Sequence, residues 1–167
     1  MSPSAGPLPE LTPLMRAVEA AGRRYHRLLF VVGESDAGRR ALLGKLVSES
    51  GAALIQVSLN VSERLLPEPR ADRIPEVGFV LEELIASGER PIVCLDAIEV
   101  LFLPELRVDV LGRLRQLSRN RTLVVNWPGG WDGRHLTYAD RGHPEFFESP
   151  SDATAVFFAS GFTPSVP

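Results

Sequence analysis

The sequence of 167 residues is long enough for one domain with a hydrophobic core and too short for two. Hydrophobic residues make up 44% of it and charged residues 23%, a balance that is typical of globular proteins and excludes a disordered chain. The formal net charge of −3 excludes a dominant basic surface for nucleic acids, although it leaves room for a local basic patch.

The sequence carries no sign of export or of a membrane anchor. No run approaches 18 apolar residues, and the first residues lack the basic-then-apolar pattern of a signal peptide. The single cysteine, Cys94, cannot form an internal disulfide, and we expect it to pack in the core rather than to act as a nucleophile. We therefore expect a cytoplasmic protein that makes no contact with a membrane.

Helices and short apolar strands are predicted to alternate along the chain. Residues 1–10 contain three prolines and are expected to form a flexible lead, followed by a single domain over 11–167. In chain order, the pattern predicts a helix over 11–22, a strand over 27–32, a helix over 39–50, a strand over 53–59, a helical turn over 60–63, a helix over 76–87, a strand over 92–95, a helix over 108–118, and strands over 122–125 and 135–139. This alternation predicts a three-layer α/β fold with a mostly parallel central sheet.

The strongest chemical signal is a glycine-bounded loop between the first strand and the second helix. Its spacing, G-x-x-x-x-G, is that of a P-loop, in which backbone N–H groups and a helix N-terminus bind phosphate. The candidate nucleotide-binding residues are Gly33, Glu34, Ser35, Asp36, Ala37, Gly38, Arg39 and Arg40. Arg39 replaces the P-loop lysine, and Arg40 replaces the hydroxyl residue that binds Mg²⁺. The loop therefore predicts binding of ATP or ADP, disfavours Mg²⁺, and allows at most a weak ATPase; the alternative is an ordinary strand–turn–helix glycine pair.

Polar residues also follow two later strands. Asp96 ends the strand over 92–95, as the acid of a Walker B element does, and is the candidate metal-binding residue. Glu99 is the candidate catalytic residue that polarises an attacking water, or else a surface carboxylate. Asn126 ends the strand over 122–125, where it is either a sensor of the terminal phosphate or a turn residue. The order of loop, acid and polar strand end favours a P-loop domain.

These residues carry a resemblance to a known family. The loop and the stretch LDAIEVLF resemble the additional-strand class of P-loop NTPases, which includes AAA+ and RecA-like domains. The stretches LFLPEL (101–106), LSRNRTLVVNWPG (117–129) and DGRHLTYADRGHPE (132–145) resemble BrxF, the small P-loop protein of BREX phage-exclusion systems. The resemblance spans residues 28–146.

The resemblance implies a cytoplasmic subunit of a bacterial antiviral defence complex. Its implied partners are the large ATPase, the methyltransferase and the phosphatase-like protein of the BREX system. It places Gly33, Gly38 and Arg39 at the phosphate loop and Asp96 at the Walker B position. The departure at Arg39 and Arg40 puts any ATPase activity of the wider class in question.

Two further groups of residues are candidates for contact with DNA or with a partner protein. Arg115, Arg119 and Arg121, together with Arg113, form a basic cluster that either binds phosphates or is a solvated helix face. Trp127 and Trp131 flank a Pro-Gly-Gly turn, where they either dock a partner or fasten the loop to the core.

The sequence leaves three functions open. The first is an accessory subunit whose nucleotide occupancy gates assembly with partner proteins, with a homo-oligomer among the assemblies allowed. The second is an interaction scaffold that binds no nucleotide. The third is a DNA-contacting subunit of the same defence complex, and binding to duplex DNA that falls with salt would identify it.

Overall fold

The computed structural model describes residues 11–150 and 155–159, so the predicted lead over 1–10 lies outside the described residues. Seven segments of helix are present in this part of the chain: α1 (Leu11–Gly22), α2 (Asp36–Ser50), α3 (Val57–Leu65), α4 (Arg70–Ala86), the 3-10 helices η1 (Glu99–Phe102) and η2 (Pro104–Leu106), and α5 (Val110–Leu117). The strands are β1 (Leu28–Val32), β2 (Ala53–Gln56), β3 (Ile92–Asp96), β4 (Thr122–Asn126), β5 (Gly130–Trp131), β6 (His135–Tyr138), β7 (Phe147–Pro150) and β8 (Ala155–Phe158). None of the helices in the described part is long and apolar enough to cross a membrane.

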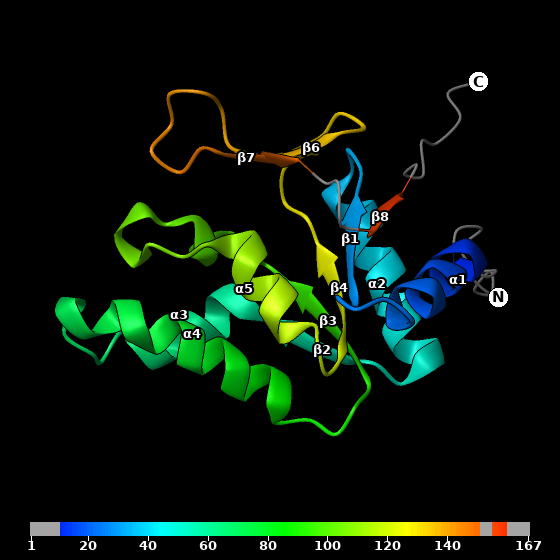
Figure 1. Cartoon of the computed structure of the whole chain (residues 1–167), viewed down its shortest axis with the longest axis horizontal. Coiled ribbons are helices and arrows are strands. Elements are labelled where there is room, and N and C mark those ends of the chain that lie inside the picture. The colour runs from blue at the N-terminus through cyan, green and yellow to red at the C-terminus, as the bar shows by residue number, and fades with distance from the viewer. Residues whose placement is uncertain (1–10, 151–154, 160–167) are drawn as a thin grey trace, which may run out of the picture.

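The central sheet has five parallel strands in the order β2-β3-β4-β1-β8 (Figure 1). The strand that leads into the glycine loop, β1, is separated from β3, which ends in Asp96, by the additional strand β4. Helices cover both faces, with α1 and α2 on one side and α3, α4 and α5 on the other (Figure 1). The predicted three-layer α/β fold is confirmed, and its strand order is that of a P-loop NTPase-like domain.

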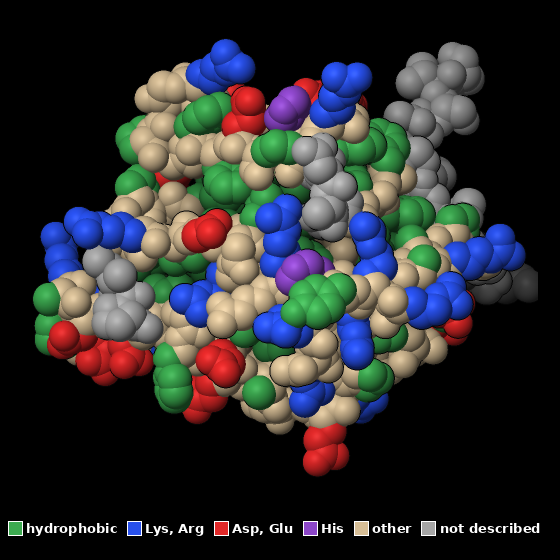
Figure 2. Space-filling view, in the orientation of Figure 1, with side chains coloured by type: hydrophobic (Ala, Val, Ile, Leu, Met, Phe, Trp, Pro, Cys, Tyr) green, Lys and Arg blue, Asp and Glu red, His purple; other side chains and the backbone are tan. Residues whose placement is uncertain are grey.

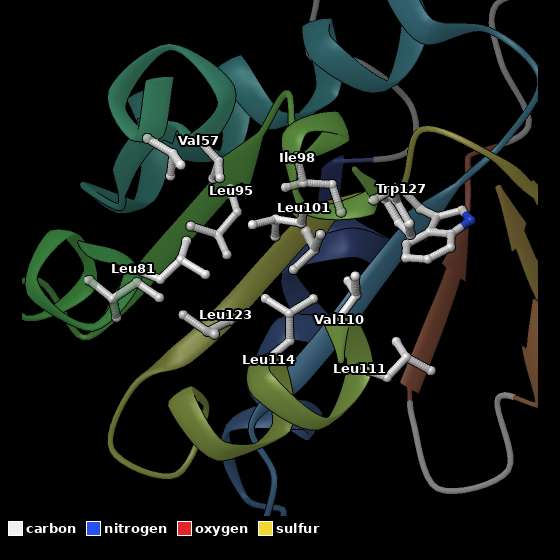
Figure 3. Packing of buried hydrophobic residues seen from close by; sticks show 14 of the residues in the cluster. Val57, Leu81, Leu95, Ile98, Leu101, Val110, Leu111, Leu114, Leu123 and Trp127 are labelled. Carbon is white, nitrogen blue, oxygen red and sulfur yellow. The ribbon is translucent and has the colours of Figure 1, made fainter. Parts of the chain in front are cut away.

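The larger half of the core lies between the sheet and helices α3, α4 and α5. Alternate residues of the central strands face it, because successive side chains of a strand point to opposite faces. Figure 3 shows Leu95 and Leu123 of the sheet packed against Leu114 of α5 and Leu101 of η1, with Trp127 at the far end. The nearly continuous apolar runs of β1, β3 and β4 thus exist because both faces of the sheet are buried.

The opposite half of the core contains the cysteine. Cys94 is buried in the cluster that joins the sheet to helices α1 and α2, and it lies opposite Val124 of β4 in the sheet. Burial raises the pKa of its thiol to about 12, because an apolar environment disfavours the thiolate. This is the packing role that the sequence predicted.

We expect Cys94 to be inert toward thiol reagents in the folded protein. The thiolate is the reactive form, and burial removes both the charge and the access that the reagent needs. Titration with a chromogenic disulfide reagent should show no reaction under native conditions and one thiol per chain in denaturant. Rapid native labelling would show that this half of the core opens locally.

A second, antiparallel sheet of order β5-β6-β7 lies beyond the carboxyl ends of β1 and β4 (Figure 1). Trp127, directly after β4, joins the two sheets. It is fully buried, its ring meets Phe30 and Phe102 edge to face at 5.3 and 5.5 Å between centroids, and its Nε1 donates a hydrogen bond of 3.0 Å to the carbonyl of Thr137. The role of Trp127 as a partner-docking residue is therefore corrected: it fastens the loop to the core.

Several boundaries differ from the sequence-based predictions. The predicted strand over 53–59 ends at Gln56, and its last residues begin α3. Helix α4 begins at Arg70 rather than near residue 76, and α2 begins at Asp36 rather than at Arg39. The strand predicted over 135–139 exists as β6 but belongs to the small sheet. The difference at α2 has consequences for the candidate site.

Candidate functional site

The glycine loop, Asp96 and Asn126 lie at one place in the structure. The strands β1, β2, β3 and β4 are parallel, so Gly33, Gln56, Asp96 and Asn126 lie at the same edge of the sheet. Crevices at the carboxyl ends of open α/β sheets are where such folds bind ligands. The sequence predicted this convergence except for Gln56, which pairs directly with Asp96 in the register of β2 and β3.

The glycine loop is shorter than its spacing predicts, because helix α2 starts inside it. Ser35 is the N-cap, and its hydroxyl accepts a hydrogen bond of 3.0 Å from the N–H of Gly38. The N–H of Arg39 donates to the carbonyl of Ser35 at 3.0 Å. Two N–H groups that a P-loop would direct at phosphate are thus used to cap and propagate the helix. The exposed side chains of Glu34, Asp36 and Ala37 lie around this turn.

The first glycine of the loop has a packing role. Gly33 has φ of 152°, and a Cβ added there would collide with the backbone carbonyl of Ala159, just after β8. The N–H of Ala159 in turn donates 2.7 Å to the carbonyl of Val32. A glycine at 33 is therefore required by the close approach of the C-terminal strand, whatever the loop binds.

Arg39, at the P-loop lysine position, is buried and points into the loop. Its guanidinium donates to Oδ1 of Asn126 at 2.7 Å, to Oδ1 of Asp36 at 3.0 Å, and to the carbonyl of Gly33. These acceptors belong to β4, to α2 and to the loop itself. The arginine side chain thus ties the three elements together from the position at which a lysine would reach phosphate.

Arg40, in place of the Mg²⁺-binding hydroxyl, forms ion pairs with two acids. Its guanidinium lies 3.2 Å from Oδ2 of the buried Asp96 and 2.9 Å from Oδ2 of Asp36. Asp96 also accepts hydrogen bonds from Asn126 at 2.8 Å, from the N–H of Ala97 at 2.8 Å and from Gln56 at 3.3 Å. The chain therefore surrounds the Walker B-like carboxylate with its own donors.

These surroundings set the ionisation of Asp96. Burial alone would raise the pKa of this carboxyl, but the hydrogen bonds from Asn126 and Ala97, the charge of Arg40 and the hydrogen bond from Gln56 together hold the pKa below its ordinary value of 3.8. Asp96 is thus a carboxylate at neutral pH. The positive charge that balances this carboxylate comes from Arg40.

We expect Asp96 to make the protein sensitive to acid. Because the pKa of Asp96 is lower in the folded than in the unfolded chain, its ionised form stabilises the fold above pH 3.8, and this contribution is lost as the pH falls through the folded-state value. Asp96→Asn should flatten the loss of unfolding free energy below that pH in urea titrations. An unchanged pH profile in the variant would contradict the assignment.

The site does not fit Mg²⁺. Magnesium requires oxygen ligands in octahedral geometry, and here the Asp96 carboxylate is engaged by an arginine and two amides, with no hydroxyl at position 40. In the described ranges 11–150 and 155–159, no three His, Cys, Asp or Glu side chains are grouped so as to hold a metal ion.

Glu99 does not join this network. It is the first residue of η1 and half-buried, and no hydrogen bond or ion pair links it to Asp96 or Arg39 in the described structure. Its charge instead acts on Tyr138, whose pKa is raised by burial and by the carboxylates of Glu145 and Glu99. The structure therefore does not support Glu99 as the residue that polarises a water at the loop.

The other candidate residues lie elsewhere. Arg119 and Arg121 border a hollow at the opposite end of the sheet, whereas Arg115 lies outside its lining and is half-buried. Trp131 is also half-buried, with its ring 6.3 Å from that of Phe158. The predicted basic cluster is therefore corrected in one member: Arg113, Arg119 and Arg121 line the hollow, and Arg115 does not.

The comparisons with known proteins add little to this geometry. No model of a protein family matches the chain, and no curated protein matches it. Among solved structures, the crystal structure of a DNA replication initiation factor has a TM-score of 0.46 and 15% identity, and the match covers 89% of this chain and 44% of that one. This chain thus spans less than half the length of that structure. The fold assignment rests on the strand order and on the position of the loop.

Proposed function

We propose that the protein is an accessory P-loop subunit of a BREX-type phage-defence complex, and that it serves in assembly rather than in ATP hydrolysis. The observation that carries the second half of this proposal is the set of contacts made by Arg39 and Arg40. One fills the loop from within, and the other takes the position of the metal beside Asp96. A nucleotide phosphate would meet the charge of Arg39, and a Mg²⁺ ion would meet the charge of Asp96. Contacts within the chain already neutralise both of these charges.

The link to phage defence rests on the sequence resemblance, and the fold gives the resembling stretches a common place. Phe102 from the first stretch, Trp127 from the second and Tyr138 from the third form one aromatic cluster, in which Phe102 and Tyr138 stack at 4.1 Å. The three stretches thus build a single feature of the fold.

The experiment for the defence role is a phage-plaquing assay in a bacterial host that carries the remaining BREX components. We expect protection to be lost without this chain and restored by the wild-type chain. We also expect Arg40→Ala to restore it, because a subunit that hydrolyses nothing does not need the residue beside Asp96. Protection that persists without the chain would overturn the proposal, and loss of protection with a folded Arg40→Ala chain would overturn its non-hydrolytic part.

A nucleotide-gated subunit is the second candidate, and the observation that favours it is the position of the loop at the carboxyl ends of β1, β3 and β4. Calorimetric titration with ATP and with ADP, each with and without Mg²⁺, separates the two candidates. Because contacts within the chain already fill the loop, we expect no heat of binding at millimolar nucleotide. Micromolar binding that Arg40→Ala leaves intact and Arg39→Ala abolishes would select nucleotide gating instead. A reconstructed loop, Arg39→Lys with Arg40→Thr, tests whether these two residues alone close the site.

A further inference from the structure

The end of the sheet opposite the loop carries an arginine-rich hollow. Its volume is about 570 Å³, and it lies where β1 and β4 begin. Three segments line it: the turn after α1, the last turn of α4, and α5 with the turn that follows. The arginines in its lining are Arg24, Arg27, Arg113, Arg119 and Arg121. We name this surface the basic hollow.

The arginines of the basic hollow form no ion pair within the described part of the chain. None of the five lies within 4.0 Å of a carboxylate there, and Glu82 is the one acid in the lining. Arginines at 39, 40, 64 and 141 are each paired with an acid, and what distinguishes the hollow is that five arginines line one surface. A protein of net charge −3 thus concentrates unpaired positive charge on one surface. Figure 2 shows Lys and Arg side chains gathered around a histidine near the centre of the molecule.

Hydrogen bonds hold the walls of the basic hollow in place. The N–H of Arg27 donates to the carbonyl of Ser118 at 3.1 Å, and Nδ1 of His26 lies 3.0 Å from the carbonyl of Arg115, so the turn after α1 is fixed to the end of α5. Arg121 donates to the carbonyl of Arg90 at 2.6 Å. The charges are therefore presented on a rigid frame, which lowers the entropy that binding must overcome.

One aromatic ring is exposed beside these charges. Tyr25 is 68% exposed, and the guanidinium of Arg119 lies 5.0 Å from the centre of its ring. Exposed aromatic rings among arginines are used to contact sugars and bases next to a phosphate backbone. Together with the polar side chains of Gln116 and Asn120, this composition matches a nucleic acid, in which sugars and bases lie next to every phosphate.

We propose that the basic hollow binds the phosphate backbone of a nucleic acid without reading its sequence. Guanidinium groups bind phosphate through paired hydrogen bonds and release condensed counterions on binding. The site is separate from the glycine loop. Binding of nucleic acid at this site can therefore be tested independently of the assembly role proposed above.

The test is fluorescence anisotropy of labelled duplex DNA of mixed sequence with the full chain. If the five arginines neutralise one phosphate each, log K against log salt has a slope of about −4.5, so affinity falls by about 500-fold between 50 and 200 mM salt. Arg24→Ala with Arg119→Ala should lower the slope by about 2. Both side chains are exposed, so the fold is retained.

The matched control is Arg70→Ala with Arg141→Ala, which removes the same charge from exposed positions outside the hollow. This control should bind DNA with the wild-type slope. Absence of binding at 50 mM salt, or equal loss in both double variants, would overturn the proposal, as salt below about 0.1 M screens such contacts least. Competition by polyglutamate as effective as that by unlabelled DNA would also overturn it and indicate an acidic protein partner. Single-stranded DNA in place of duplex shows which form is preferred, and stronger binding of either form supports the site.

Discussion

Trp127→Ala is expected to lower the free energy of unfolding by about 3 to 5 kcal/mol, the cost of emptying a large aromatic site in a core. The side chain is fully buried, and its loss leaves a cavity between Phe30 of β1, Phe102 of η1 and Phe147 of β7. It also leaves the carbonyl of Thr137 without its indole donor. Urea unfolding followed by far-UV circular dichroism measures the change without relying on tryptophan fluorescence.

The second tryptophan is the control for this prediction. Trp131 is half-buried, so Trp131→Ala should cost only about 1 to 2 kcal/mol, in proportion to the smaller apolar area that it buries. Equal losses for the two variants would show that the small sheet is not held to the large one through Trp127. A preserved stability in Trp127→Ala would contradict the central role of this residue outright.

Arg39→Ala is expected to lower the free energy of unfolding by about 2 to 3 kcal/mol, because it strips donors from acceptors in a buried site. Asn126 loses its 2.7 Å partner, and the carbonyl of Gly33 and the carboxylate of Asp36 lose theirs. A side chain retained only to bind a ligand would have no such effect in the free protein. The stability of the free chain therefore distinguishes a structural arginine from a phosphate-binding one.

Its neighbour provides a control with the same change of charge. Arg40 is 51% exposed at its side chain, and Asp96 keeps three hydrogen-bond donors without it, so Arg40→Ala should cost about 1 kcal/mol or less. Arg39→Lys should fall between the two, since an ammonium cannot copy the planar fork that reaches three acceptors. A larger loss for Arg40→Ala than for Arg39→Ala would reverse the roles assigned to these residues.

The sequence predicted the sheet well because its strands are buried on both faces. The runs of β1 and β3 are apolar at every position before their last residue, β4 is apolar between Thr122 and Asn126, and parallel strands bring the last residues together. The nearness of Asp96 and Asn126 follows directly. The start of α3 at Val57 could not be predicted, since Val-Ser-Leu suits a strand and a helix equally until tertiary packing decides.

The conformation of the glycine loop could not be predicted from the spacing of its glycines. The pattern G-x-x-x-x-G records which residues are glycine, and it does not record that Ser35 caps the helix or that Ala159 lies against Gly33. The basic cluster was similarly incomplete. Arg24 and Arg27 are distant in sequence from Arg113, and the pairing of β1 with β4 and the hydrogen bond from Arg27 to Ser118 bring their segments together. Both features depend on contacts between segments that are far apart along the chain.

The strand order also governs how the chain can fold during synthesis. In the described sheet the strand β1 pairs with β4 and β8, so Leu28 lies opposite Leu123 and Leu29 opposite Ala155. At a ribosomal rate of 5 to 20 residues per second, the apolar segment Leu28–Val32 is synthesised roughly 5 to 20 s before β4, its first strand partner. Every strand partner of this early segment is made late. A nascent chain released before β4 would expose one of the most apolar stretches of the protein, and its folding would depend on protection from aggregation throughout that interval.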